Sequence, residues 1–231
     1  MYETPTLAGF FVQAAVAEDN YWDIALKYAD EFNGVRIAGA IGYLEDTKFN
    51  GGFQLFNQAG ALCVTNCDLK SEELKGSLSL KHMPTGLFVS AGAGERELSG
   101  SNTAVTGAYV GPNARFWSLA GGIARNVTGL GDTVFFGEYS EHKGGLAQQQ
   151  FIANPAVLQH CTGATGCGST VSQWGLGVNQ FIDAAAMEIF ATYKNYSLES
   201  SGFVDGSSTP NKGASGVSDM SMFIVGTRIQ F

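Results

Sequence analysis

The sequence is poor in charged residues, prolines, cysteines and histidines. Its 13 basic and 21 acidic residues make up 15% of 231 residues, against about 25% in an average globular protein. It has only 5 prolines, 4 cysteines and 3 histidines. No apolar run approaches the ~20 residues of a transmembrane helix, and no basic-headed apolar leader is present, so no signal peptide is expected. A net charge of −8 and a pI near 4.8 exclude the basic face that a nucleic-acid partner requires.

The sequence is instead rich in glycine and aromatic residues. It holds 31 Gly, 16 Phe, 8 Tyr and 3 Trp, with a mean hydropathy of +0.03, which is too apolar for a disordered chain. A helical period is nearly absent, whereas alternation with a period of two is common. Trp22, Ile24, Leu26 and Tyr28, for example, alternate with polar or small residues. This composition and pattern predict an all-β protein.

The alternation predicts ten strands of about 10 to 13 residues. Strands of globular proteins average ~5–6 residues, while a strand that crosses a bilayer needs ~9–11. The predicted strands are therefore long enough to cross a membrane. They cover residues 6–17, 21–32, 35–45, 73–83, 86–95, 114–126, 132–142, 171–181, 185–197 and 219–231.

Short and long connections alternate along the chain. The short ones include Asn33-Gly34, a hairpin signal, and turns at Pro84-Thr85, Gly129–Gly131 and Asp183. The long ones cover 46–72, 96–113, 143–170 and 198–218, although the first connection at that end, near Glu18–Asn20, is short. In an up-and-down sheet, alternate connections lie at opposite ends, so one end has tight turns and the other large loops. Outer-membrane barrels show this asymmetry, so we predict a transmembrane antiparallel β-barrel.

Four segments resemble the C-terminal part of a Gram-negative outer-membrane porin, most closely the general porins of alphaproteobacteria. Residues 2–10 resemble the start of a mid-chain strand, and residues 21–28 resemble the next strand. Residues 182–188 resemble a late periplasmic turn and strand, and residues 225–231 resemble the last strand, which ends on Phe in this family.

The resemblance implies a location, a function and partners. It implies an outer-membrane protein of a Gram-negative bacterium, forming a homotrimeric, water-filled channel for small hydrophilic solutes and ions. Its C-terminal Phe231 would be read by the barrel-assembly machinery. Members of the family have sixteen strands, so we expect residues 1–231 to form one barrel domain, truncated at its N-terminus and covering the last ten strands.

Alternation assigns charged side chains to the inside of the barrel. If Phe231 faces lipid, residues of the opposite parity face the lumen, since a charge on the lipid face costs ~2–4 kcal/mol at the midplane. Such charges would set the ion preference of a pore; alternatively, they only solvate the wall or pair with one another. Strand 114–126 breaks the rule, because Arg115 and Arg125 share parity with apolar residues, and we expect a bulge at Gly121-Gly122 to switch the face. The predicted pore-lining residues are Asp23, Lys27, Arg36, Lys75, Lys81, Glu138 and Arg228.

Aromatic side chains fall near the strand ends. Interfacial girdles of barrels use such rings at the headgroup level, although ordinary core packing is the alternative. The predicted girdle residues are Trp22, Tyr28, Tyr43, Trp174, Tyr193 and Phe231.

Cysteines and histidines complete the candidate residues. An even number of cysteines in an oxidising compartment favours disulfides, and we expect two local ones, in the loops that hold Cys63 with Cys67 and Cys161 with Cys167.

His82, His142 and His160 belong to no organised nucleophile motif. We therefore predict no catalytic residue, no enzyme, no metal and no cofactor. Two alternatives remain open: an outer-membrane enzyme with external carboxylates and histidines, and an adhesin acting through loops 46–72 and 143–170.

Overall fold

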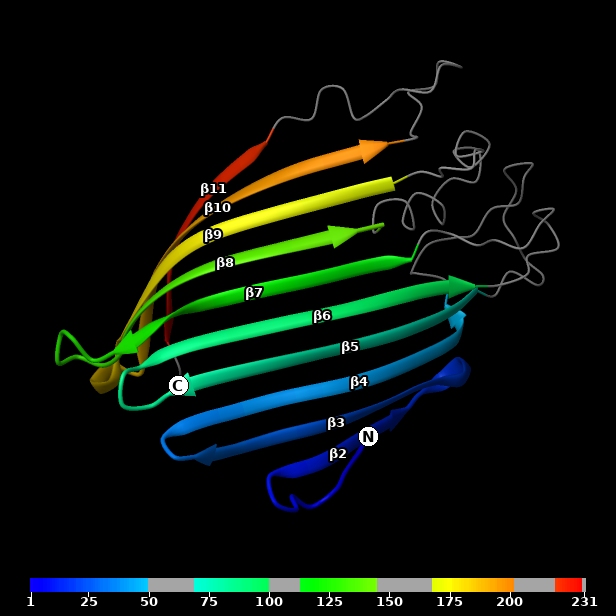
Figure 1. Ribbon diagram of the computed structural model, residues 1–231, viewed down its shortest axis with the longest axis horizontal. Coiled ribbons are helices and arrows are strands. Elements are labelled where there is room, and N and C mark those ends of the chain that lie inside the picture. The colour runs from blue at the N-terminus through cyan, green and yellow to red at the C-terminus, as the bar shows by residue number, and fades with distance from the viewer. Residues whose placement is uncertain (50–68, 100–112, 145–167, 202–218, 230–231) are drawn as a thin grey trace.

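The protein folds into one antiparallel sheet whose eleven strands follow one another in chain order (Figure 1). The computed structural model describes residues 1–49, 69–99, 113–144, 168–201 and 219–229. The all-β, up-and-down architecture predicted from the sequence is confirmed. The strands are β1 (Tyr2–Glu3), β2 (Phe10–Val16), β3 (Tyr21–Phe32), β4 (Val35–Phe49), β5 (Leu69–His82), β6 (Leu87–Ser99), β7 (Ala114–Arg125), β8 (Thr133–Lys143), β9 (Gly168–Ile182), β10 (Met187–Ser201) and β11 (Met220–Ile229).

The ten predicted strands correspond to β2 to β11, and the start of the chain differs from the prediction. The predicted strand 6–17 begins only at Phe10, because Ala8 (φ 50°) and Gly9 (φ 82°) form a tight turn. The chain before this turn runs back along β2, where the Thr4 amide donates to the Val12 carbonyl at 3.0 Å. The two-residue strand β1 is therefore an extra strand at this edge.

Tight turns gather at one end of the sheet. Asn33 and Gly34, both with positive φ (49° and 75°), connect β3 to β4, which is the geometry that an Asn-Gly hairpin favours. The short connections from β5 to β6, from β7 to β8 and from β9 to β10 lie at the same end, which we call the turn end. At the opposite end, which we call the loop end, β2 joins β3 through the 3₁₀ turn Glu18–Asn20, and the longer connections begin.

Strand register is continuous across most of the sheet. The ladders from β2 to β11 run without interruption except for one shift between Asp46 and Phe49 in the pair β4–β5. Because side chains alternate between the two faces of a strand, the paired positions assign every strand residue to one of two faces.

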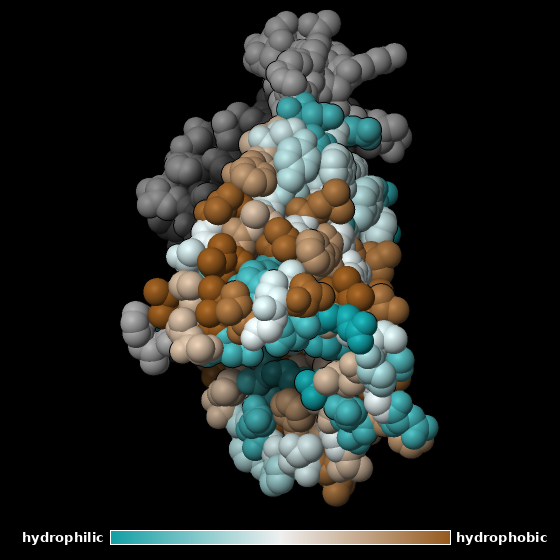
Figure 2. Space-filling view, turned by 90° about the vertical axis from the view of Figure 1, so that its left-hand side faces the viewer, coloured by the Kyte–Doolittle hydropathy of each residue, from teal (hydrophilic) through white to brown (hydrophobic). Residues whose placement is uncertain are grey.

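Burial along the strands is the reverse of that in a soluble protein. On β3 the apolar residues Trp22, Ile24 and Leu26 are 38 to 44% exposed, whereas Asp23 and Lys27 on the other face are more shielded. The face that carries exposed apolar side chains is called the outer face below, and the other the inner face. Figure 2 shows hydrophobic residues gathered across the middle of the side that it presents. A sheet with apolar groups outside and polar groups inside is suited to a hydrocarbon surrounding.

The sheet is curved, and its two edges are not paired with each other within the described residues. The ladders place β1 and β2 at one edge and β11 at the other. None of the helices among the described residues is long and apolar enough to cross a membrane.

Candidate functional site

All the charged residues predicted to line a pore lie on the inner face. Their faces follow from the register: Asp23 pairs with Leu44, for instance, and Lys27 with Ala40, while the outward Ile24 pairs with Tyr43. Their role in lining a pore stays a prediction. The inner-face set is Asp23, Lys27, Arg36, Lys75, Lys81, Glu138 and Arg228.

Most of the inner-face cations sit beside a carboxylate. Arg36 lies 3.2 Å from Glu31, its direct partner across the β3–β4 hairpin. Lys75 lies 3.0 Å from Glu73, two residues away on the same face of β5. The remaining pairs are Arg96 with Glu73 at 4.0 Å, Lys81 with Asp132 at 3.9 Å, Lys194 with Glu138 at 2.6 Å and Arg228 with Glu188 at 2.5 Å.

The pair Lys194–Glu138 is the most enclosed of these contacts. Each side chain is 25% exposed, and the same Glu138 oxygen accepts a hydrogen bond from the Gln173 amide at 2.7 Å. Alternation within the predicted strand 185–197 places Lys194 and Glu188 on one face, and the same rule applied to strand 73–83 would have found Glu73. The apolar side chains dominate the alternation of each strand, so Lys194, Glu188 and Glu73 on the opposite face were missed.

Lys27 differs from the other inner-face cations. Its described partners are the amide oxygen of Gln13, to which the ammonium donates, and the ring of Phe11, whose centroid lies 5.7 Å from Nζ. Neither partner carries a negative charge. Lys27 therefore leaves a positive charge on this part of the inner face.

The middle of the inner face is built from small residues on β4 to β7. Between the levels of Lys75 and Lys81 on β5, no side chain on this face of β4 to β7 is larger than serine. In this middle part of the inner face, the side chains therefore project only a short distance from the sheet. Its residues are Ala38, Ala40 and Gly42 on β4, Ser77 and Ser79 on β5, Ser90 and Gly92 on β6, and Ser118 and Ala120 on β7.

Four phenylalanines of the inner face lie flat on the sheet, each against a glycine directly opposite. A Cβ added to Gly94 would come 2.6 Å from Phe116, and one added to Gly226 would come 2.5 Å from Phe190. The rings fill the space over the glycine backbones and do not project from the sheet. The four pairs are Phe116 with Gly94, Phe88 with Gly122, Phe136 with Gly177 and Phe190 with Gly226.

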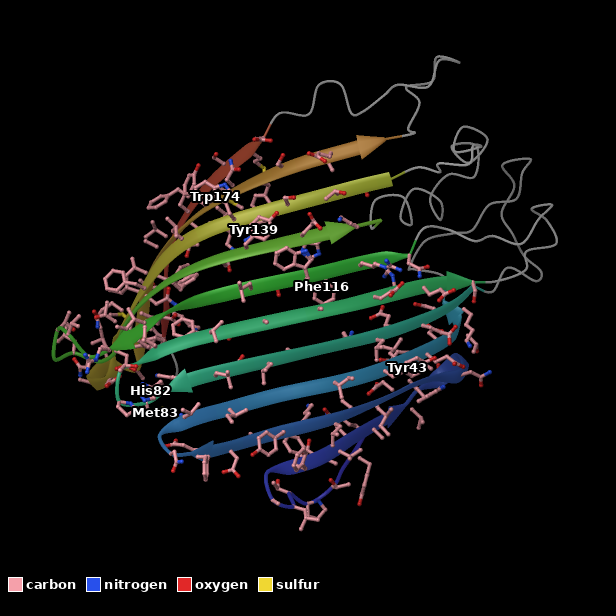
Figure 3. All side chains as sticks on the ribbon, viewed as in Figure 1. Tyr43, His82, Met83, Phe116, Tyr139 and Trp174 are labelled. Carbon is pink, nitrogen blue, oxygen red and sulfur yellow. The ribbon has the colours of Figure 1, made fainter. Side chains whose placement is uncertain are left out.

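The outer face carries diagonal Trp–Tyr pairs toward the loop end. Ring centroids lie 5.3 Å apart in Trp22–Tyr43, 5.1 Å in Trp117–Tyr139 and 5.4 Å in Trp174–Tyr193; Figure 3 labels Tyr43, Tyr139 and Trp174 on β4, β8 and β9. Tyr28 also lies on this face, against Phe10 at 4.5 Å. Trp117 and Tyr139 were missed, because the arginines of strand 114–126 obscured its face.

The tryptophans follow a line that is inclined to the strands. Following the paired positions from β3, Trp117 on β7 lies four residues nearer the turn end than the level of Trp22, and Trp174 on β9 lies six residues nearer. The line thus moves one residue for each strand. At ~3.3 Å per residue and ~4.8 Å between strands, the line is inclined by about 35° to the direction perpendicular to the strands. Strands of outer-membrane barrels are tilted by ~35–45°, so the line is parallel to the expected membrane surface.

The predicted bulge at Gly121-Gly122 is wrong. Both ladders of β7 run through these glycines without a register shift, so Arg115 and Arg125 lie on the outer face with Trp117. They are ten residues apart, at opposite ends of the strand. That separation is about 33 Å along β7, or roughly 27 Å of height at a 35° tilt, close to the ~25 Å apolar band of such barrels. Their long stems allow the charged groups to reach the two polar margins of this band.

Several predicted residues lie outside the described part of the chain. These are the girdle residue Phe231, His160 and the four cysteines Cys63, Cys67, Cys161 and Cys167. The described histidines are far apart: His82 lies at the turn end, where Nδ1 is 2.7 Å from Thr85 Oγ1 (Figure 3), and His142 stacks on Phe116 near the loop end of β8, with centroids 5.8 Å apart.

Comparison with known proteins supports the fold. No family model matches the chain, and no curated protein matches it. Among solved structures, the chain is similar to OmpT, an outer membrane protein of Vibrio cholerae, folded in vitro and solved in its trimer form. The TM-score is 0.51 and the sequence identity 16%, over 95% of this chain and 60% of that chain. The fold is therefore that of an outer-membrane β-barrel protein, which agrees with the predicted location in the outer membrane of a Gram-negative bacterium. This chain spans about 60% of the length of the solved one.

The prediction that the chain is not an enzyme is corrected. The match to an outer membrane protein at 16% identity relates this chain to a fold, and a fold does not fix a function. The prediction depended on the lack of a local nucleophile motif in the sequence, but catalytic residues of a barrel can come from separate strands and loops, so the lack of such a motif does not decide the question.

Proposed function

We propose that the chain forms the wall of a water-filled channel through which small hydrophilic solutes and ions diffuse across the outer membrane. The observation that carries this proposal is the reversed pattern of the sheet, with an exposed apolar outer face and an inner face of charged and small residues. A solid barrel would fill its interior with bulky side chains. Here the middle of the inner face on β4 to β7 has no side chain larger than serine, and the phenylalanines lie flat.

The inner-face charges would act on the solutes that pass. Paired groups such as Arg36–Glu31 keep the wall polar while contributing little net field, whereas Lys27 contributes a positive charge. Ion preference in this proposal is set by a few wall charges together with the width of the lumen. The similarity of four segments to alphaproteobacterial porins supports the same function.

The proposal includes a closed wall and partners. An unpaired strand edge in hydrocarbon costs several kcal/mol for each unsatisfied group, so the edges at β2 and β11 must be paired for a channel to exist in a membrane. We propose assembly as a homotrimer, as in the solved OmpT trimer form, contacts with outer-membrane lipid, and recognition of Phe231 by the barrel-assembly machinery.

Planar-bilayer conductance of the chain refolded in detergent tests the proposal. Stable, discrete current steps are expected, with a unit conductance that changes when Arg36, Lys75 and Lys81 are replaced together by alanine. A folded sample that inserts into the bilayer and gives no steps would contradict the channel. Steps whose size and ion selectivity are unchanged in the triple variant would show that these three residues do not line it.

A further inference from the structure

Arg125 carries an uncompensated charge at the turn end of the outer face. Its guanidinium donates to the Pro84 carbonyl at 3.3 Å, and among the described residues it contacts no carboxylate. The side chain is exposed. At the other end of β7, by contrast, Arg115 is already paired with Glu95 at 2.9 Å. Arg125 therefore presents a positive charge that a partner outside the sheet can neutralise.

The position of Arg125 defines which part of the membrane it meets. The short turns of an outer-membrane barrel face the periplasm, and the long loops face the outside. Arg125 thus lies at the periplasmic margin of the apolar band, at the level of headgroups. The periplasmic leaflet of an outer membrane consists of phospholipid, so phosphate groups surround the barrel at this level.

An apolar track leads from Arg125 toward the middle of the membrane. Because the tryptophan line marks the membrane plane, the membrane normal is inclined by about 35° to the strands and moves about two residues toward the loop end for each strand crossed. From Arg125, which pairs with Thr133, this path reaches Phe135 on β8 and then Leu176 on β9. These two side chains are 54% and 59% exposed. The path from Arg125 to Leu176 is about 16 Å long, roughly half of the ~30 Å hydrocarbon core, as one acyl chain requires.

A shallow hollow of about 620 Å³ opens along this track. The glycines Gly121 and Gly137 are direct partners on β7 and β8 and form its floor on the outer face, where they leave the backbone without side chains. The hollow lies between the level of Arg125 and the middle of the apolar band. The apolar side chains that border it on the outer face belong to Leu87, Ile123, Phe135 and Leu176.

We propose that Arg125 and this hollow form a binding site for one anionic diacyl phospholipid of the periplasmic leaflet. The lipid phosphate gains charge-assisted hydrogen bonds from the guanidinium, and an acyl chain fills the hollow over the two glycines. No described carboxylate contacts Arg125, so the ammonium of a zwitterionic headgroup finds no acceptor of opposite charge beside it. A lipid with a net negative charge is therefore favoured. The site is independent of whether the barrel conducts.

Native mass spectrometry of the full chain, refolded in detergent and titrated with phosphatidylglycerol or phosphatidylethanolamine, tests the site. The unchanged protein is expected to retain one phosphatidylglycerol and to bind phosphatidylethanolamine more weakly. Arg125→Gln is expected to weaken phosphatidylglycerol binding about tenfold and to remove the preference between the two lipids. Arg115→Gln is the matched control, since that guanidinium is already paired, and leaves binding unchanged.

The hollow is tested by a second pair of variants that keeps Arg125 in place. Gly121→Leu fills the floor and is expected to weaken the binding of both lipids, whereas Ala191→Leu, on the outer face of β10 but outside the hollow, is not. Equal binding of the two lipids by the unchanged protein would overturn the assignment of an anionic lipid. Equal losses in Arg125→Gln and Arg115→Gln, or in Gly121→Leu and Ala191→Leu, would overturn the site.

Discussion

The ring of Phe136 on β8 lies across the backbone of Gly177, its direct partner on β9, and fills the space in which a side chain would stand. Thr192 on β10 borders the same space, with Oγ1 3.0 Å from a Cβ placed on the glycine. Gly177 is therefore required by the position of the ring rather than by its backbone angles.

Gly177→Ala is expected to destabilise the folded barrel by about 1–3 kcal/mol, because the added methyl forces the Phe136 ring off the sheet. The measurement is the urea dependence of unfolding in detergent micelles. Gly121→Ala is the matched control, since a Cβ there meets only the Phe88 carbonyl oxygen, at 3.4 Å. Equal loss of stability in both variants would show that the ring contact is not the cause.

A charge placed inside the outer apolar band is expected to be far more costly than one on the inner face. Leu119 is 48% exposed on the outer face of β7, near the middle of the strand, four residues from Arg115 and six from Arg125. Leu119→Arg should therefore cost ~2–4 kcal/mol in lipid vesicles.

The neighbouring position supplies the control for that experiment. Ser118 lies on the inner face, opposite Gly92 and Ser140, so Ser118→Arg should leave the free energy of unfolding nearly unchanged if the inner face is wet. A larger loss for Ser118→Arg than for Leu119→Arg would reverse the assignment of the two faces.

The sequence predicted the architecture well because alternation and turn residues are local signals. The Asn33-Gly34 hairpin and the ten long strands needed only the period of two and the position of turns. The Ala8-Gly9 turn was missed, because an apolar Leu7 and Phe10 on either side continue the strand pattern. β7 was misread for another reason: alternation assigns a residue to one face of the strand, but it does not say at what level of the membrane the residue lies. Arg115 and Arg125 are on the outer face at its polar margins, and only the register reveals this.

Contacts across strands could not be predicted from the sequence. The phenylalanine–glycine pairs require knowledge of which residues stand opposite each other, and Phe136 and Gly177 are 41 positions apart. The inner-face pair Lys194–Glu138 likewise joins two strands, β10 and β8, that are not neighbours in the sheet. The contact passes over Gly175 on β9, the strand between them.

The four cysteines are expected to form two local disulfides, Cys63 with Cys67 and Cys161 with Cys167. Because the predicted loops face an oxidising compartment, the protein isolated from membranes should not react with iodoacetamide until it is reduced, and should then take up four carbamidomethyl groups. Peptide mapping of the unreduced chain would identify the pairs. Alkylation without reduction, or a bridge between the two loops, would contradict the prediction.

Lys27 and Lys194 are expected to respond differently to neutralisation. Lys27 contacts uncharged partners, the Gln13 amide oxygen and the Phe11 ring, so Lys27→Gln removes a positive charge without exposing a carboxylate. In the proposed channel it should shift the ion preference toward cations, seen as a change in reversal potential under a salt gradient, with little loss of stability. A reversal potential unchanged in Lys27→Gln would show that Lys27 does not face the conducting path.

Lys194→Gln leaves the partly enclosed Glu138 with Gln173 alone, and should lower the free energy of unfolding by about 1–2 kcal/mol. Equal stability of Lys194→Gln and Lys27→Gln would show that the Lys194–Glu138 contact is solvent-screened.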